Sequence, residues 1–63
     1  MEYPSLKGMA LRGIGWAHVE QGDLDAAQQA YEASLVSDPG NRTALAELEY
    51  IAQQRAATGS AGQ

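Results

Sequence analysis

The fold is decided by residues 21–41, which read QGDLDAAQQAYEASLVSDPGN. Turn-forming residues stand at both ends of this stretch, first Gly22 and Asp23, then the run from Asp38 to Asn41. The segment between them is rich in Ala, Leu, Gln and Glu, which favour helices. Asp23 is a good N-cap, and the proline after Asp38 disfavours helical geometry at that residue. We therefore expect the residues between the two turns to form one helix.

Working outward from this helix gives two more. Gly22 can adopt the positive φ that ends a preceding helix, and Asn41 is a suitable N-cap for a following one. No segment shows the alternation of β-branched residues that a strand needs. The sequence therefore predicts an all-α fold with helices over about residues 5–20, 24–37 and 42–56.

The expected domain organisation follows from these helices. Residues 1–4 are predicted to be an N-terminal extension, and residues 5–56 a single three-helix domain. Residues 57–63 are expected to form a flexible tail, because this Gly-rich segment has no large apolar side chain to bury.

Apolar spacing predicts how the helices meet. Short connections make neighbouring helices antiparallel, so the first two should form a helix-turn-helix hairpin that the third helix covers. Gly15 and Ala27 are small where the hairpin helices should approach most closely, and Tyr31 can fill the space beside them. The residues expected in the core are Leu11, Ile14, Gly15 and His18 on the first helix, Leu24, Ala27, Tyr31, Ser34 and Leu35 on the second, and Ala44, Leu48, Ile51 and Ala52 on the third.

The composition limits the classes of ligand that the chain is expected to bind. The chain has 63 residues, no cysteine, one histidine and a formal net charge of −4. The negative charge argues against nucleic acid as the ligand, and no apolar run approaches the length of a membrane span. We expect a cytoplasmic protein that binds neither nucleic acid nor membrane. The acidic excess lies in residues 23–38, as a solvated helix face or, alternatively, an acidic docking patch.

No catalytic or cofactor motif is complete. Asp23-x-Asp25 lacks the later ligands of a calcium loop, and Gly13-x-Gly15 lacks the strand and third glycine of a dinucleotide site. His18 has no Cys or second His with which to hold a metal, so it is expected to be a packed core histidine or, alternatively, a proton-sensitive weak point. We predict no enzyme activity, no cofactor and no metal.

The pattern Leu11-x2-Ile14-Gly15-x2-His18, then Ala27-x3-Tyr31, then Pro39, resembles the tetratricopeptide repeat, a helical hairpin of about 34 residues. The resemblance covers roughly residues 8–41 as one repeat, and residues 42–56 look like the start of the next. Glu49 stands where the repeat has a small residue, so the third helix is expected to be the polar cap of such an array.

The resemblance implies a function in protein binding. In this family one side of the first helix of each repeat lines a groove that receives an extended peptide or a partner helix. The matching residues of this chain are Met9, Arg12, Trp16, Val19, Thr43, Ala46, Tyr50 and Gln53. Because only Arg12 is basic among them, a peptide anchored by apolar or aromatic side chains fits better than one held by its terminal carboxylate.

A second side of the first helix carries only small residues. Ala10, Gly13 and Ala17 are spaced by three and four, so they form a flat stripe that would pack on a preceding repeat. The alternative function is therefore a structural one, in which the chain is a self-associating unit, or a minimal designed or excised repeat without a ligand, that forms a homo-oligomer through this stripe.

Overall fold

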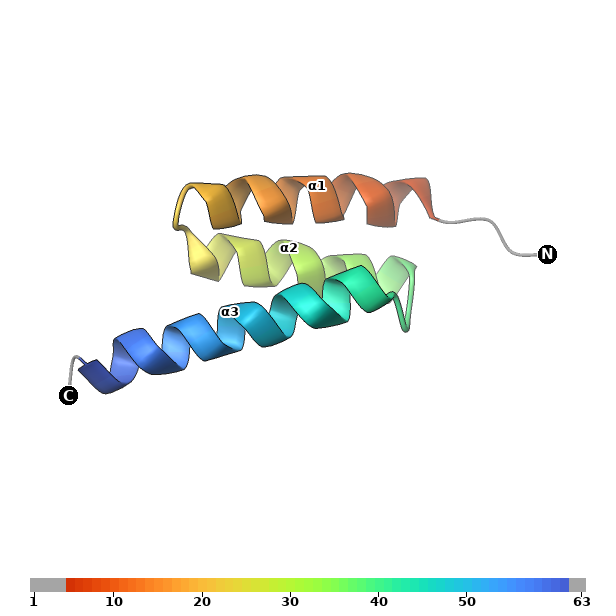
Figure 1. The fold of residues 1–63 in the computed structure, drawn as a ribbon. Coiled ribbons are helices and arrows are strands. Elements are labelled where there is room, and N and C mark those ends of the chain that lie inside the picture. The colour runs from red at the N-terminus through yellow and green to blue at the C-terminus, as the bar shows by residue number, and fades with distance from the viewer. Residues whose placement is uncertain (1–4, 62–63) are drawn as a thin grey trace.

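The computed structural model describes residues 5–61, and these form three α-helices (Figure 1). They are α1 (Leu6–Glu20), α2 (Leu24–Ser37) and α3 (Arg42–Ala61). The predicted all-α fold is confirmed. Residues 1–4, predicted as an extension, and residues 62–63 of the predicted tail lie outside the described residues.

The predicted end of the third helix is wrong. α3 continues to Ala61 and does not end near residue 56, so residues 57–61 of the expected flexible tail belong to the helix. Residues 52–57 read AQQRAA, all strong helix formers, and no proline follows them. Because no proline interrupts the helix, propagation adds one hydrogen bond per residue and continues through residues 58–61 despite the poor helix propensity of Gly59.

Side-chain caps begin all three helices. Asp23 Oδ1 accepts a hydrogen bond from the Ala26 amide at 3.2 Å, and Asn41 Oδ1 accepts one from the Ala44 amide at 3.0 Å. Both caps were predicted from the sequence and are confirmed. Ser5 caps α1 in the same way by accepting from the Gly8 amide at 3.0 Å.

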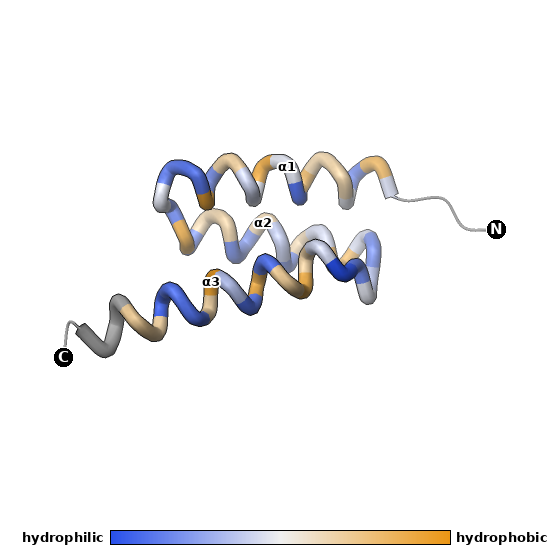
Figure 2. Tube along the Cα trace, viewed as in Figure 1, coloured by the Kyte–Doolittle hydropathy of each residue, from blue (hydrophilic) through white to orange (hydrophobic). Residues whose placement is uncertain are grey.

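Glycines with positive φ make the two turns. Gly22 has φ of +78° and Gly40 has φ of +81°, which L side chains adopt only with strain. Figure 2 shows that hydrophilic residues gather at both turns. The predicted role of Gly22 in ending the first helix is confirmed.

α2 is the central element of the fold. The three helices run antiparallel in succession, and α1 and α3 both pack on α2 (Figure 1). α1 and α3 make little contact with each other, so α2 must supply one surface for each neighbour. Tyr31 of α2 is 1% exposed and is the largest of the fully buried side chains.

The buried cluster consists of Ala27, Tyr31, Ala44 and Ile51, against which Val19, Leu24, Leu35 and Leu48 pack. Most of the predicted core is confirmed, but Ile14 and Ala52 are exposed. Consecutive helix positions are rotated by about 100°. Gly15 and Ile51 lie on the sides of their helices that face the core. The side chains of their neighbours Ile14 and Ala52 are therefore directed away from it, toward solvent.

Gly15 and Tyr31 make a close contact between α1 and α2. A Cβ placed on Gly15 would lie 2.7 Å from Cε2 of Tyr31, too close for any real side chain. The buried Ser34 hydroxyl, one turn further along α2, donates to the Tyr31 carbonyl at 2.7 Å, so it is satisfied without a partner on α1. The distance between α1 and α2 is thus set by a ring lying on a helix backbone.

We predict that Gly15→Ala destabilises the fold. The methyl group would push the Tyr31 ring or α1 aside, at a cost of about 1–3 kcal/mol, a large share of the roughly 3–5 kcal/mol available to a domain of this size. Urea unfolding followed by circular dichroism measures the loss.

The matched control is Gly13→Ala on the same helix. A Cβ on Gly13 meets no atom within 4 Å, so only helix propensity changes. This variant should be more stable than the parent by about 0.5–1 kcal/mol. Equal stability of the two alanine variants would contradict the assigned packing of Tyr31.

Candidate functional site

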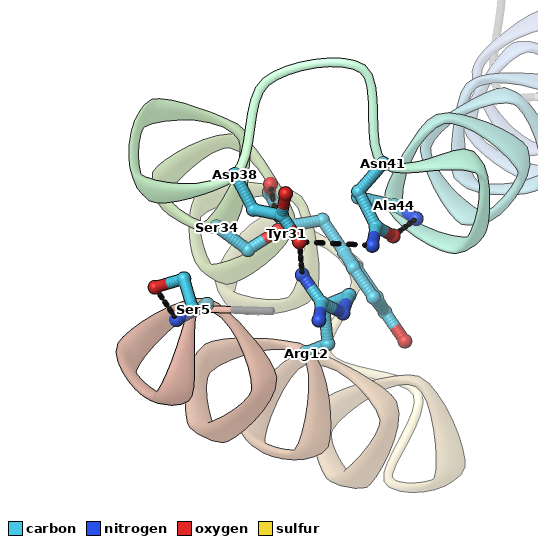
Figure 3. A network of polar contacts seen from close by, with 8 residues as sticks. Ser5, Arg12, Tyr31, Ser34, Asp38, Asn41 and Ala44 are labelled. Atoms are coloured by element: carbon cyan, nitrogen blue, oxygen red, sulfur yellow. Dashed lines mark hydrogen bonds and ion pairs between the residues drawn. The ribbon is translucent and has the colours of Figure 1, made fainter. Parts of the chain in front are cut away.

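A polar junction joins the three helices beside the loop that connects α2 to α3 (Figure 3). Arg12 Nη1 of α1 lies 3.3 Å from Oδ2 of Asp38, the residue that follows α2. The same oxygen accepts a hydrogen bond from Nδ2 of Asn41, the cap of α3, at 3.1 Å. One carboxylate therefore holds one group from the first helix and one from the start of the third.

Gly8 makes room for this junction. A Cβ on Gly8 would lie 3.1 Å from Arg12 Nη1 and 3.2 Å from the Asp38 Cβ, so any larger residue would crowd both groups.

The sequence analysis did not predict the ion pair between Arg12 and Asp38, because these two residues are far apart in the chain. The sequence did contain an indication of this ion pair. Arg12 follows Gly8 by one helical turn on the same side of the first helix, and Asp38 ends the antiparallel second helix.

A second ion pair joins α2 and α3 further along. Arg55 Nη1 pairs with Asp25 Oδ1, but their side chains are 44% and 75% exposed, against 13% and 28% for Arg12 and Asp38. Water screens exposed charges, so the Arg12 pair contributes more to stability.

The hydroxyl end of the Tyr31 ring extends toward the space between α1 and α3 (Figure 3). Its pKa is raised above the ordinary value of 10.0, chiefly because burial removes water from the phenolate and secondly because the Glu47 carboxylate repels it. The Arg12 guanidinium acts in the opposite direction. Charges on both outer helices therefore act on this phenol, that of Glu47 from α3 and that of Arg12 from α1.

The residues predicted to bind a peptide fall into two groups. Trp16, Met9 and Tyr50 are 57%, 48% and 45% exposed. The smaller or polar members Thr43, Ala46 and Gln53 are also exposed. In contrast, Arg12 is engaged by Asp38 and Val19 packs against the core. That these residues line a peptide groove stays a prediction.

The residues predicted for self-association are all exposed. Ala10, Gly13 and Ala17 lie on the part of α1 that faces away from α2, and the space beside Gly13 is open. Self-association through them also stays a prediction.

His18 is half-buried, with its Nδ1 atom buried. That nitrogen has no hydrogen-bond partner within residues 5–61. The ring therefore points inward, as expected of a packed histidine.

Within residues 5–61, no three His, Cys, Asp or Glu side chains gather where they could hold a metal ion. Across the same residues, no helix combines the length and apolar character needed to cross a membrane.

The described residues define an all-α protein in which an antiparallel helical hairpin carries a third helix. The chain is 43% identical over 60 residues to the heat shock protein sti1 homolog of Schizosaccharomyces pombe. The match covers 92% of this chain but only 9% of that protein, so the chain corresponds to a short segment of it. No family model matches the chain, and no solved structure matches it.

We predict that Arg12→Gln lowers the free energy of unfolding by about 1 kcal/mol, because Asp38 loses a shielded partner that ties α1 to the end of α2. The matched control is Arg55→Gln, which removes an exposed pair and should cost less than about 0.5 kcal/mol. Thermal unfolding of both variants measures the difference. A larger loss of unfolding free energy for Arg55→Gln than for Arg12→Gln would show that the Arg12–Asp38 pair is not the more stabilising of the two.

The raised pKa of Tyr31 predicts a loss of stability in alkali. Above pH 10.0 the unfolded chain releases the phenolic proton while the folded chain still holds it, so stability falls as pH rises. The melting temperature of the parent should therefore drop more steeply above about pH 10 than that of Tyr31→Phe, which has no proton to release. Parallel pH profiles of the two proteins would contradict the burial of this phenol.

Proposed function

We propose that this chain is a protein-binding module of the tetratricopeptide type, which holds an extended peptide or a partner helix. Its binding residues form what we name the Trp16–Tyr50 surface, which consists of Met9, Trp16, Thr43, Ala46, Tyr50 and Gln53. The observation that carries the proposal is the 57% exposure of the one tryptophan in a chain that has very little core.

The exposed side chains suit a binding role energetically. Tryptophan, tyrosine and methionine are enriched in protein interfaces, and tryptophan and tyrosine supply much of the binding energy there. A domain of 63 residues gains stability from every apolar group that it buries, so leaving Trp16 and Met9 half-exposed forgoes stabilisation. A partner that covers these side chains would recover it.

Helical spacing supports a shared location for the two aromatic residues. Trp16 is one helical turn after Arg12 on α1, and Tyr50 is one turn after Glu47 on α3. The charges of Arg12 and Glu47 both act on the Tyr31 phenol, which is compatible with Trp16 and Tyr50 lying on the sides of α1 and α3 nearest to that ring. This arrangement would let one ligand contact both rings.

Similarity to part of a heat shock protein is compatible with this proposal. Local geometry also agrees with the repeat: Gly15 receives the Tyr31 ring, and glycines with positive φ close both turns. The similarity and the local geometry together support a role in binding other proteins rather than a catalytic role.

We predict that Trp16→Ala weakens binding at least about 30-fold, the effect of removing a hot-spot residue worth about 2 kcal/mol. Peptides selected on the parent protein from a random phage-displayed library supply the ligands. Binding to parent and variant is compared by isothermal titration calorimetry, with circular dichroism to verify helicity.

The matched control is Val36→Ala. Val36 is 83% exposed on α2, outside the Trp16–Tyr50 surface, and its truncation should leave the dissociation constant unchanged. If selected peptides bind Trp16→Ala as tightly as the parent, Trp16 only shields the core and the assigned surface is wrong.

A further inference from the structure

We infer that the segment recognised by the Trp16–Tyr50 surface is basic as well as apolar: a peptide whose apolar anchors are flanked by lysine or arginine. The inference rests on the proposed function and adds the charge of the partner. It follows from the positions of the charged side chains around the two exposed rings.

Two of the three arginines are already engaged in ion pairs. The chain has four Lys and Arg residues, and Arg12 and Arg55 pair with Asp38 and Asp25. Arg12 matters most, because it is the basic residue beside Trp16 that could have received a carboxylate from a ligand. Its guanidinium is instead neutralised within the fold, and its side chain is only 13% exposed.

The other two basic residues lie away from the rings. Lys7 precedes Trp16 by nine positions, which places it on the opposite side of α1. Arg42 is the first residue of α3, about 12 Å along the helix from Tyr50. That separation exceeds the screening length of about 8 Å at physiological salt. Neither residue supplies positive charge next to the aromatic side chains.

Carboxylates, by contrast, flank both rings. Glu20 is exposed one turn after Trp16 on α1, and Glu47 is half-buried one turn before Tyr50 on α3. Side chains at these spacings on a helix are neighbours, about 5–6 Å apart at Cβ. Neither carboxylate forms an ion pair with another side chain of residues 5–61.

The surface is therefore electronegative and aromatic. A lysine or arginine beside the apolar anchors of a ligand would pair with Glu20 or Glu47 and could also lie over the face of Trp16 or Tyr50. At the two rings, an acidic segment or a terminal carboxylate would meet the carboxylates of Glu20 and Glu47, whereas the exposed Arg42 stands beside Thr43 and Ala46 at the far end of the surface. The net charge of −4 acts in the same direction at longer range.

The test uses two synthetic nine-residue peptides with blocked ends and identical leucine and alanine positions. One peptide carries three lysines and the other carries three glutamates at the same places. Trp16 is the only tryptophan of the chain, so its fluorescence reports binding directly. We expect the lysine peptide to bind at least about tenfold more tightly at low salt, and the preference to shrink at 1 M salt.

Variants identify the carboxylates responsible. Glu20→Gln and Glu47→Gln should each weaken binding of the lysine peptide by about twofold to fivefold. The matched control is Glu32→Gln, which makes the same charge change at an exposed position of α2 and should leave binding unchanged. An equal effect of all three variants would assign the preference to net charge and contradict the roles of Glu20 and Glu47.

The outcomes separate this inference from the function on which it rests. If both peptides bind through Trp16 with equal affinity, or the glutamate peptide binds more tightly, the inferred charge of the partner is wrong and the binding function stands. If neither peptide changes the Trp16 fluorescence and the phage library yields no ligand, the proposed function is wrong, and the inference fails with it.

Discussion

The ring of Tyr31 lies against the backbone of Gly15, and the other contacts of this small fold depend on that approach. Only a residue without a side chain permits it, because a Cβ on Gly15 would stand 2.7 Å from the ring. The ring fills the space between α1 and α2, and its phenol reaches the region where charges of α1 and α3 act on it. Tyr31 is thus the largest fully buried side chain of a small core that has no disulfide to support it.

The polar junction complements this contact and shapes the outer surface. Arg12, Asp38 and Asn41 fix where α3 begins, because Asn41 both caps α3 and donates to the carboxylate that holds Arg12. In this junction Asp38 neutralises Arg12, the basic residue one helical turn before Trp16. A stabilising interaction therefore also sets the chemistry of the neighbouring surface, which is left with exposed aromatic rings flanked by Glu20 and Glu47.

The sequence predicted the parts of the fold that depend on local chemistry. Asp23 and Asn41 cap their helices, and Gly22 ends the first, because each effect acts over one turn of backbone. Apolar spacing also identified Tyr31 and Gly15 as partners. It misplaced Ile14, because spacing alone does not say whether a flank position is covered. It missed Arg12 with Asp38, because residues 26 positions apart meet only once the helices are packed. For the candidate site, helical spacing identified the exposed aromatic residues. It did not predict that Arg12 is engaged, because that depends on the tertiary contact with Asp38.

The packing of the Tyr31 ring on Gly15, which positions α1 beside α2, can be tested directly by NMR spectroscopy. The measurement is a nuclear Overhauser experiment on the isotopically labelled chain, which detects pairs of protons closer than about 5 Å. We expect strong cross-peaks between the Tyr31 ring protons and the Gly15 α-protons, since the ring carbons lie within contact distance of that backbone. Absence of these cross-peaks in a folded, helical sample would contradict this packing.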